Sequence, residues 1–339
     1  MTETDRDLLN SFVEDAITNF DVQVKSFEFV SASENIVYRI NTVEGESFAL
    51  RIHRPGYHNI HELESEHLWT AVLSDAGFRV PDPLVTRDGN AYSFLPFDTD
   101  GSRYVGMSTW LEGAPLQELM SEKGFDQIKI FGLAGALIAQ LHNHSEQWEM
   151  PEGFTRHSLD LEGLLGDSPW WTQYWKMPEM SQEQSKTILA ARDRLRTILM
   201  DQGISSQTYG IIHGDLLPQN ILVHDSVLSP IDFDDCAFGY HLYDISVALI
   251  NVSAEINFPE ILDSFICEYR KHRDFSDQML QTLPLFILIR QFMSIGWFNS
   301  RVPTALVFGS GKVIERGEYL VPAIDRAVHE CNRLLTDLQ

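Results

Sequence analysis

Hydrophobic and polar residues follow two different periods along this chain. Short alternating runs in the first third are typical of strands, whereas apolar residues recur at helical spacing in the remainder. For the first third we expect a helix at residues 7–19, strands at 25–30, 35–41 and 48–55 with a turn at Glu44-Gly45, a helix carrying Leu68, Ala71 and Val72, and a strand at 104–113. The boundary falls near Glu112-Gly113.

The residues after this boundary are predicted to be mainly helical. We expect helices at 126–142, 182–200, 259–272, 278–298 and 317–338, and an irregular, Trp-rich stretch at 148–178. A chain of 339 residues is longer than one hydrophobic core usually supports, so two subdomains are predicted. The pattern therefore indicates an α+β protein with a small antiparallel sheet followed by a helical part.

The charge balance narrows the possible partners. The chain has 49 acidic against 25 basic residues, a formal net charge of −24, so its field repels nucleic acid phosphates and favours cationic or metal-bearing ligands. No stretch approaches the roughly 18 uninterrupted apolar residues of a membrane span, and the polar start is not a signal peptide. We expect a cytoplasmic protein that binds neither nucleic acid nor membrane; the sequence does not indicate its oligomeric state.

Several residues suggest metal or nucleotide motifs without completing them. Cys236, Cys267 and Cys331 lack the spacing of a zinc site or a disulfide framework. His142 and His144 are interpreted as polar residues at a helix end, and His61-Glu62 lacks the second His of a zinc-protease helix. The segment 309–312 lacks the flanking residues of a phosphate-binding Walker loop and is interpreted as a turn.

The segment 209–236 carries the candidate chemistry. Apolar residues 209–212 and 221–223 predict two short strands, and the polar loop between them carries His213, Asp215 and Asn220. Asp225-Ser226 predicts a turn into a third strand at 227–233, which carries Asp232. Such a hairpin brings Asn220 and Asp232 to one mouth, where two oxygen ligands suit Mg²⁺. In kinase-type sites an Asp orients the acceptor hydroxyl, while an Asn five residues later and a further Asp hold the metal. Asp215, Asn220 and Asp232 fit these roles.

These motifs resemble those of the aminoglycoside phosphotransferase and choline kinase family, which has a protein-kinase-like, two-lobed fold. The run from Phe233 to Ile245 is further similar to type II homoserine kinases and the stress-response Ser/Thr kinase. The resemblance implies a nucleotide-binding lobe at 1–106, a hinge at 107–113 and a helical lobe at 114–339 with the catalytic loop and the acceptor pocket. It also implies that Asp244 supports the catalytic loop; a helix cap before residues 245–250 is a further interpretation of Asp244, compatible with the same role.

The resemblance assigns nucleotide contacts in the first lobe. Arg51 stands where the family has a Lys that reaches the nucleotide phosphates, and arginine keeps the charge with a different geometry. Glu66 matches the acid that pairs with this cation, with Glu62 or a solvated helix face as alternatives. The phosphate-covering hairpin has no Gly and offers Ser31, Ser33 and Asn35 instead. At the hinge, backbone groups of Met107, Thr109 and Leu111 would meet the base of ATP, with GTP not excluded.

The acceptor is the part of the prediction that stays open. Asp234, Asp235 and Tyr240 follow the metal acid, and Arg290, Trp297 and Arg301 lie on or just after a late helix that shapes the pocket in the family, although Trp297 also fits a core position. An amino acid acceptor needs an Arg for its carboxylate, whereas an amino alcohol or aminoglycoside needs acids or an aromatic cage.

Three functional hypotheses follow from these residues. The first is transfer of the ATP γ-phosphoryl group to a hydroxyl of a small molecule, namely an amino acid, an amino alcohol or an aminoglycoside-like compound, with Mg²⁺. The second is a protein Ser/Thr kinase of the stress-response type. The third is a nucleotide-binding regulator without turnover, suggested by Arg51 and the Gly-free hairpin, against which the joint presence of Asp215, Asn220 and Asp232 argues.

Overall fold

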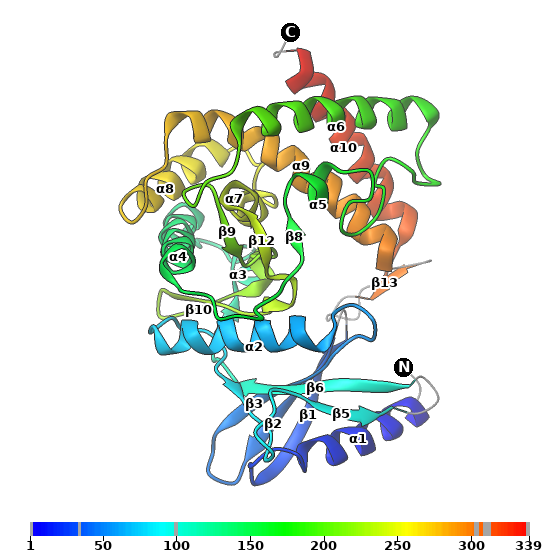
Figure 1. Ribbon diagram of the computed structural model, residues 1–339, viewed down its shortest axis with the longest axis vertical. Helices are drawn as coiled ribbons and strands as arrows, with labels where there is room; N and C mark the ends of the chain where they lie inside the picture. The colour runs from blue at the N-terminus through cyan, green and yellow to red at the C-terminus, as the bar shows by residue number, and fades with distance from the viewer. Residues whose placement is uncertain (1–2, 33–34, 98–100, 302–304, 308–312, 337–339) are drawn as a thin grey trace. The chain divides into compact units, whose positions relative to one another are not determined.

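The computed structural model describes residues 3–32, 35–97, 101–301, 305–307 and 313–336. The chain divides into two compact units at Glu112–Gly113. Met1–Glu112 makes up most of the first unit, which Pro151–Thr155 joins. The second unit contains Gly113–Met150, Arg156–Leu306 and the C-terminal segment from Val313. Figure 1 shows the first unit as a sheet with two helices and the second as mainly helical.

The first unit is built on an antiparallel sheet with strand order β1-β2-β3-β6-β4, to which β5 adds by pairing with β6. Its elements are α1 (Glu3–Ile17), β1 (Val24–Ala32), β2 (Ile36–Thr42), β3 (Ser47–Ile52), α2 (Ile60–Asp75), β4 (Pro83–Leu84), β5 (Ser93–Pro96) and β6 (Ser102–Thr109).

Alternation along the strands explains the core of this unit. In β2 and β3 every second side chain is buried, among them Tyr38, Ile40 and Leu50. These side chains pack in one cluster with Phe12 and Val13 of α1, so the first helix covers the inner face of the sheet. The predicted helix and strands of the first third are thus found, with ends shifted by a few residues.

The described part of the second unit contains eight helices longer than three residues and three small sheets. Its elements, in chain order, are β7 (Ala114–Pro115), α3 (Leu116–Leu119), α4 (Gln127–Gln147), β8 (Ser158–Leu159), α5 (Leu161–Leu165), α6 (Gln182–Gln202), β9 (Tyr209–Ile212), η2 (Pro218–Asn220), β10 (Ile221–His224), β11 (Val227–Pro230), η3 (Phe233–Asp235), β12 (Ala237–Tyr240), α7 (His241–Leu249), α8 (Phe258–Arg270), α9 (Asp277–Arg301), β13 (Ala305–Val307), β14 (Val313–Glu315) and α10 (Arg316–Thr336). The sheet orders are β11-β10-β7, β8-β12-β9 and β13-β14.

Close helix packing shapes this unit around α4. A Cβ atom at Gly135 would lie 2.2 Å from the carbonyl oxygen of Phe265, and one at Gly132 would lie 2.6 Å from Ser264 Oγ, so these glycines let α4 approach α8. Helix α9 is apolar and largely buried. Over Asp277–Ser300 it is long and apolar enough to cross a membrane, but 61% of that stretch is buried inside the protein, as in the core helix of a globular unit.

The structure corrects two element predictions in the second unit. The strand predicted through Phe233 ends at Pro230, and a 3-10 turn over Phe233–Asp235 follows. The helix predicted to end at His142 runs on to Gln147, which places His142 inside α4 with a completely buried side chain. The interpretation of His142 as a helix-end polar residue is therefore wrong.

Candidate active site

Asp215 lies in the loop that leaves β9, and its position depends on Gly214. Gly214 has a φ of +78°, and a Cβ atom there would lie 2.4 Å from the carbonyl oxygen of Asp235. Only glycine fits both constraints, because other residues avoid this backbone region and carry the colliding atom. The Gly between His213 and Asp215 therefore lets the loop pass against the segment that follows Asp232.

His213 links the catalytic loop to the Asp232 segment through both ring nitrogens. Its Nε2 donates to the carbonyl oxygen of Ile231 over 3.1 Å, which leaves Nδ1 to accept from the Asp215 amide at 3.4 Å. The ring is almost completely buried and packs on Phe233. This imidazole therefore holds the residue before Asp232 and the backbone of Asp215 in a fixed relation.

Asn220 fixes the other side of Asp215. Its side-chain Nδ2 donates to the backbone carbonyl of Asp215 at 2.8 Å and to Asp215 Oδ2 at 2.9 Å. With the amide nitrogen turned toward Asp215, the amide oxygen is available for another partner, as a magnesium ligand requires.

Asp232 has a backbone conformation that the sequence does not reveal. Its φ of +64° and ψ of +69° are left-handed, a region that Asp tolerates better than most residues. The adjacent Ile231 amide donates to the Asn220 carbonyl at 2.9 Å, so the two predicted metal ligands stand at one end of the β10–β11 hairpin. The turn of this hairpin, Asp225-Ser226, has two positive φ values, as expected for a tight hairpin connection.

These donors fit a magnesium ion. Asp232 is exposed and offers carboxylate oxygens, and Asn220 offers an amide oxygen, so water and phosphate oxygens would complete the coordination that Mg²⁺ prefers. No cluster of three or more His, Cys, Asp or Glu that could hold a metal occurs in the described part of the chain. The residues present thus suit a metal that arrives with phosphate ligands rather than one held in a closed protein cage.

Asp244 supports the catalytic loop from a fully buried position in α7. Its Oδ1 accepts from the Gly214 amide at 2.9 Å, and its Oδ2 accepts from the His213 amide at 3.4 Å and from His142 Nε2 at 3.2 Å. Burial raises the pKa of Asp244, while His213 and the backbone amides favour the ionised form. The helix-cap alternative is wrong, because Asp244 lies within α7 and Tyr240 occupies the N-cap position.

Sequence reasoning missed the partners behind Asp244. His142 Nδ1 lies 2.9 Å from the Tyr269 hydroxyl, and the ring stacks on His241 with centroids 4.2 Å apart. Burial lowers the pKa of His142 well below its ordinary value, and nearby Arg273 adds to this effect. The available signal was the position of His142, which falls on the apolar face of a predicted helix.

Arg290 is the acceptor candidate that the structure brings to Asp215. Its Nη2 donates to Asp215 Oδ1 at 2.9 Å and its Nη1 donates to the Tyr243 hydroxyl at 3.3 Å. The side chain is 7% exposed, and Asp215 is 23% exposed. Both oxygens of the Asp215 carboxylate, the predicted catalytic group, therefore have a protein partner, Arg290 on one and Asn220 on the other.

The other acceptor candidates are dispersed. Asp234 and Asp235 are buried in the 3-10 turn after Asp232, where Arg156 donates to the carbonyl oxygens of Asp234 and Cys236. Trp297 is half-buried on α9, with its ring centroid 6.4 Å from that of Phe298. The side chain of Arg301 lies outside the described residues.

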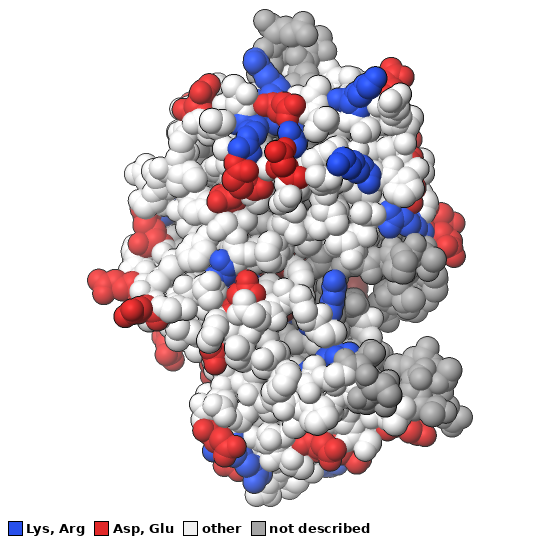
Figure 2. All heavy atoms as spheres, turned by 45° about the vertical axis from the view of Figure 1, so that its right-hand side comes forward, with Lys and Arg blue, Asp and Glu red and all other residues white. Residues whose placement is uncertain are grey.

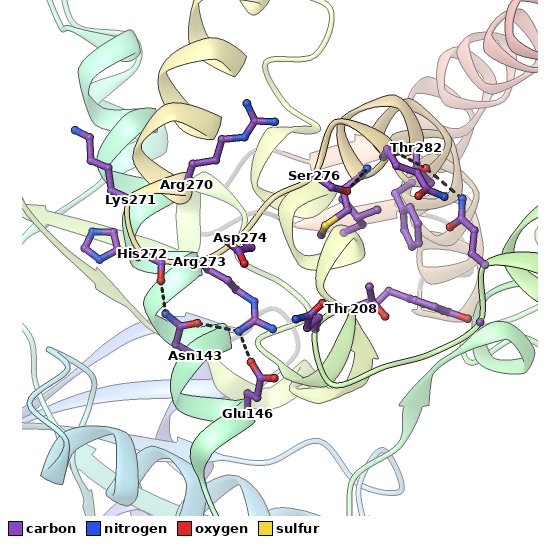
Figure 3. A pocket seen from close by; sticks show the side chains of 18 residues that line it. Asn143, Glu146, Thr208, Arg270, Lys271, His272, Arg273, Asp274, Ser276 and Thr282 are labelled. Carbon is purple, nitrogen blue, oxygen red and sulfur yellow. Dashed lines mark hydrogen bonds and ion pairs between the residues drawn. The ribbon is translucent and has the colours of Figure 1, made fainter.

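Tyr240 lies in a pocket that the predicted catalytic and metal residues do not line. This pocket of about 580 Å³ is lined by the ends of α4 and α6, the residues just before β9, the α8–α9 connection and the first half of α9, and Tyr240 forms part of its wall beside Phe286. Figure 3 shows Arg273 directed toward Asn143 and Glu146, with which it forms bonds of 2.8 and 2.6 Å. The prediction that Tyr240 faces the acceptor beside Asp234 is therefore not supported by this position.

In the first unit Arg51 pairs with Glu66 rather than with Glu62. Arg51 Nη1 lies 2.8 Å from Glu66 Oε1, and the Glu66 side chain is 4% exposed. Glu62 instead completes the capping box of α2 with Asn59. Because the glutamate is buried, it depends on the arginine for charge balance, so removal of either residue is expected to affect the other.

The hairpin candidates are only partly described. Ser31 lies near the end of β1. Asn35 is buried, and its side-chain oxygen accepts a hydrogen bond from the Arg54 amide at 3.0 Å. Ser33 lies outside the described residues. The segment 309–312 also lies outside them.

Two of the three hinge candidates have backbone groups used by the sheet. Met107 pairs with Leu50 of β3 and with Leu84 of β4, and its side chain is buried. The Thr109 amide donates to the Asp82 carbonyl at 2.9 Å. The prediction of backbone contacts to a base is thus weakened at Met107 and Thr109, and Leu111, beyond the end of β6, remains the candidate.

Charge on the surface is mixed rather than gathered. On the face in Figure 2, acidic and basic side chains are interspersed and no extended basic patch is visible. Ion pairs between α6 and its neighbours, such as Arg192–Asp167, contribute to this mixture.

A model of the phosphotransferase enzyme family matches residues 27–276. The chain belongs to this family. The predicted resemblance is confirmed at this level, and the similarity to type II homoserine kinases stays a prediction. The chain is therefore a phosphotransferase with an alcohol group as acceptor, and it has the protein-kinase-like fold found in solved choline kinases. The choline kinase of Cryptosporidium parvum Iowa II is 15% identical to this chain, and the two structures superpose over 97% of each chain with a TM-score of 0.64.

Similar family members include kinases of small molecules. The amicoumacin kinase of Bacillus subtilis (strain 168) is 22% identical over 311 residues, 87% of this chain and 88% of the relative. The hydroxylysine kinase of Mus musculus is 24% identical over 262 residues, which cover 71% of this chain and 68% of the relative. A solved microcompartment-associated aminopropanol kinase is 29% identical with a TM-score of 0.81 over 97% of this chain and 98% of its own. The solved amicoumacin kinase hAmiN, in complex with AMP-PNP, Ca²⁺ and Ami, is 20% identical, with a TM-score of 0.77 over 97% of this chain and 96% of its own.

Proposed function

We propose that this phosphotransferase moves the γ-phosphoryl group of ATP to the hydroxyl group of a small molecule that carries an amino group. The observation that carries the proposal is the geometry of the catalytic loop, in which Asn220, His213 and Asp244 together fix Asp215. Such a fixed carboxylate beside a metal-ligand pair is what transfer to a hydroxyl requires.

The amino group is supported by charge and by the relatives. Asp234 and Asp235 follow the exposed metal acid Asp232, and the whole chain carries a formal charge of −24, which favours a cationic acceptor. The relatives named above act on aminopropanol, hydroxylysine and amicoumacin, and the first two names denote compounds with both a hydroxyl and an amino group.

The proposed reaction assigns one step to each residue. The acceptor oxygen attacks the γ-phosphorus, the bond from phosphorus to the β–γ bridging oxygen breaks to release ADP, and Asp215 takes the hydroxyl proton. Asn220 and Asp232 would hold Mg²⁺, which neutralises charge on the phosphate oxygens when bound. Arg51, oriented by Glu66, would bind the nucleotide phosphates.

The decisive experiment is a screen of acceptors with ³²P-labelled ATP and Mg²⁺. The panel contains amino alcohols, hydroxy amino acids, aminoglycosides, hydroxyl compounds without an amine, and a mixture of proteins. We expect label in an amine-bearing small molecule, and a loss of roughly 10²–10⁴-fold in kcat for Asp215→Asn with nucleotide affinity retained. Asp225→Asn, an exposed change in the hairpin turn, is the matched control and keeps full activity.

Other outcomes of the same screen select the alternatives. Label confined to proteins identifies the Ser/Thr kinase hypothesis, and tight nucleotide binding with no labelled product under any condition identifies the regulator hypothesis. Normal turnover by Asp215→Asn contradicts the assignment of the catalytic residue.

A further inference from the structure

Arg290 is enclosed on several sides in the interior of the second unit. The guanidinium donates to Asp215 Oδ1 and to the Tyr243 hydroxyl, and its carbon lies 6.0 Å from the centre of the Trp171 ring. Its Nε–H is buried and has no hydrogen-bond partner in the described part of the chain. The arginine is therefore fixed beside the catalytic carboxylate and retains one donor.

The positive charge of Arg290 is balanced by Asp215. A buried guanidinium needs an anionic partner, and Asp215 at 2.9 Å is its ion-pair partner among the described residues. Tyr243 contacts the same guanidinium: burial raises its pKa to about 12, Arg290 opposes that shift, and Asp215 and Asp235 add to it. Because the charges of Arg290 and Asp215 cancel, the pair has no uncompensated positive charge to offer an acceptor.

We propose that Arg290 is a specificity-determining residue that is committed to Asp215, so that the enzyme takes amino alcohols and discriminates against acceptors with a carboxylate on the carbon next to the hydroxyl-bearing carbon. This inference rests on the proposed function, because it narrows the amine-bearing acceptor to one class. It also reverses the role that the sequence suggests for an arginine here, which is to bind the carboxylate of an amino acid.

The physical reason is competition for one cation. A substrate carboxylate that reached Arg290 would place two carboxylates on a single guanidinium. Either Asp215 loses its partner, or the substrate carboxylate stays without a partner in a buried site. An amino alcohol avoids both costs, because it brings no carboxylate to the guanidinium.

Matched acceptors test this discrimination directly. Ethanolamine and serine differ by one carboxylate, as do 1-amino-2-propanol and threonine. For the wild type we expect kcat/KM to be at least ~30-fold higher for the amino alcohol in at least one pair. Arg290→Met should lower kcat/KM for both members and should not create a preference for the amino acid. A wild-type preference for serine or threonine that disappears in Arg290→Met would overturn the proposal.

A second measurement does not depend on the identity of the acceptor. Asp215→Ala leaves Arg290 unpaired, so sodium formate should raise the melting temperature of this variant by roughly 3 °C relative to sodium chloride of equal ionic strength. The same salt should leave the wild type and the double variant Asp215→Ala/Arg290→Met unchanged.

The two experiments separate the two possible failures. If no amine-bearing acceptor is phosphorylated, the proposed function fails, while the formate titration still decides whether Arg290 is committed to Asp215. Formate stabilisation of the wild type that is absent in Arg290→Met would show that Arg290 is free to bind a carboxylate, and it would overturn the inference whatever the acceptor is.

Discussion

Asp244 and His142 form a completely buried hydrogen bond, with Asp244 Oδ2 and His142 Nε2 3.2 Å apart. Because the ionised carboxylate can only accept, Nε2 carries the hydrogen and Nδ1 accepts from the Tyr269 hydroxyl. The same carboxylate accepts from the backbone amide of Gly214. Three elements, α4, α7 and α8, thereby converge on the catalytic loop.

This relationship predicts that His142→Ala lowers kcat by about 10-fold or more while the affinity for nucleotide stays within about two-fold. The loss arises because Asp244 is left with one donor fewer in a buried site, which costs ~1–3 kcal/mol. Tyr269→Phe should have a smaller effect, because it removes only the distal bond. Steady-state kinetics and nucleotide titration measure both quantities.

His144→Ala is the control for this prediction, since His144 lies on the same helix and is less buried. It should leave kcat unchanged. Equal losses in the two variants would show that His142 acts on helix stability rather than through Asp244.

Gly214→Ala is predicted to abolish measurable activity. The methyl group would lie 2.4 Å from the Asp235 carbonyl oxygen, and the φ of +78° adds roughly 1–2 kcal/mol of backbone strain. The loop must therefore move, and Asp215 moves with it. Gly203→Ala is the matched control: its φ is +68° and no atom lies within 4 Å of its added Cβ. Gly203→Ala introduces the backbone strain without the collision and should keep activity. A coupled assay with both purified variants measures the difference.

The sequence predicts the fold and brings Asp215 and Asn220 into one loop, for a physical reason. Residues 209–223 combine apolar strands with a short polar loop, and both signals are local. Chemistry that depends on residues far apart in the chain was less accessible. Arg290 and Asp215 are 75 positions apart, and His142 and Asp244 are 102 apart, so only packing reveals that they touch. The left-handed conformation of Asp232 is equally invisible, because Asp fits several turn types.

Arg51 and Glu66 predict a graded response to substitution. Arg51→Met should raise KM for ATP by about 10-fold or more and should destabilise the protein, because Glu66 would remain buried without its cation. Arg51→Lys keeps the charge and should show a smaller rise in KM. Kinetics at varied ATP and urea unfolding measure the two effects.

Asp21→Ala provides the control for stability in the same unit. Asp21 is 97% exposed and lies 3.9 Å from Arg87, so its removal should cost no more than ~1 kcal/mol. An Arg51→Met variant as stable as Asp21→Ala would contradict the claim that Arg51 and Glu66 depend on each other.

Asp232→Ala is predicted to affect metal use more than acceptor use. Removal of the exposed carboxylate should raise the Mg²⁺ concentration for half-maximal activity by about 10-fold or more, since Mg²⁺ would keep only the Asn220 oxygen from the protein. The KM for the acceptor at saturating Mg²⁺ should change little. A magnesium dependence equal to that of the wild type would be inconsistent with Asp232 as a ligand.

The stacked pair His142 and His241 predicts acid sensitivity. Burial lowers the pKa of both imidazoles well below 6.5, and for His241 the adjacent His142 and Arg273 add to the effect. In the unfolded chain both take up protons near pH 6.5. Their contribution to stability is therefore complete above pH 6.5 and is lost as the pH falls, at up to ~1.4 kcal/mol per pH unit for each histidine.

Urea unfolding at pH 7.5, 6.5 and 5.5 tests this sign and size. The free energy of unfolding should fall toward pH 5.5, and His241→Gln should reduce the slope by about 1 kcal/mol per pH unit because one buried imidazole no longer resists protonation. His61→Gln, at an exposed position, should leave the slope unchanged. If His241→Gln also leaves the slope unchanged, the buried pair does not control acid stability, and other groups such as half-buried His67, whose pKa burial also lowers, must account for the loss.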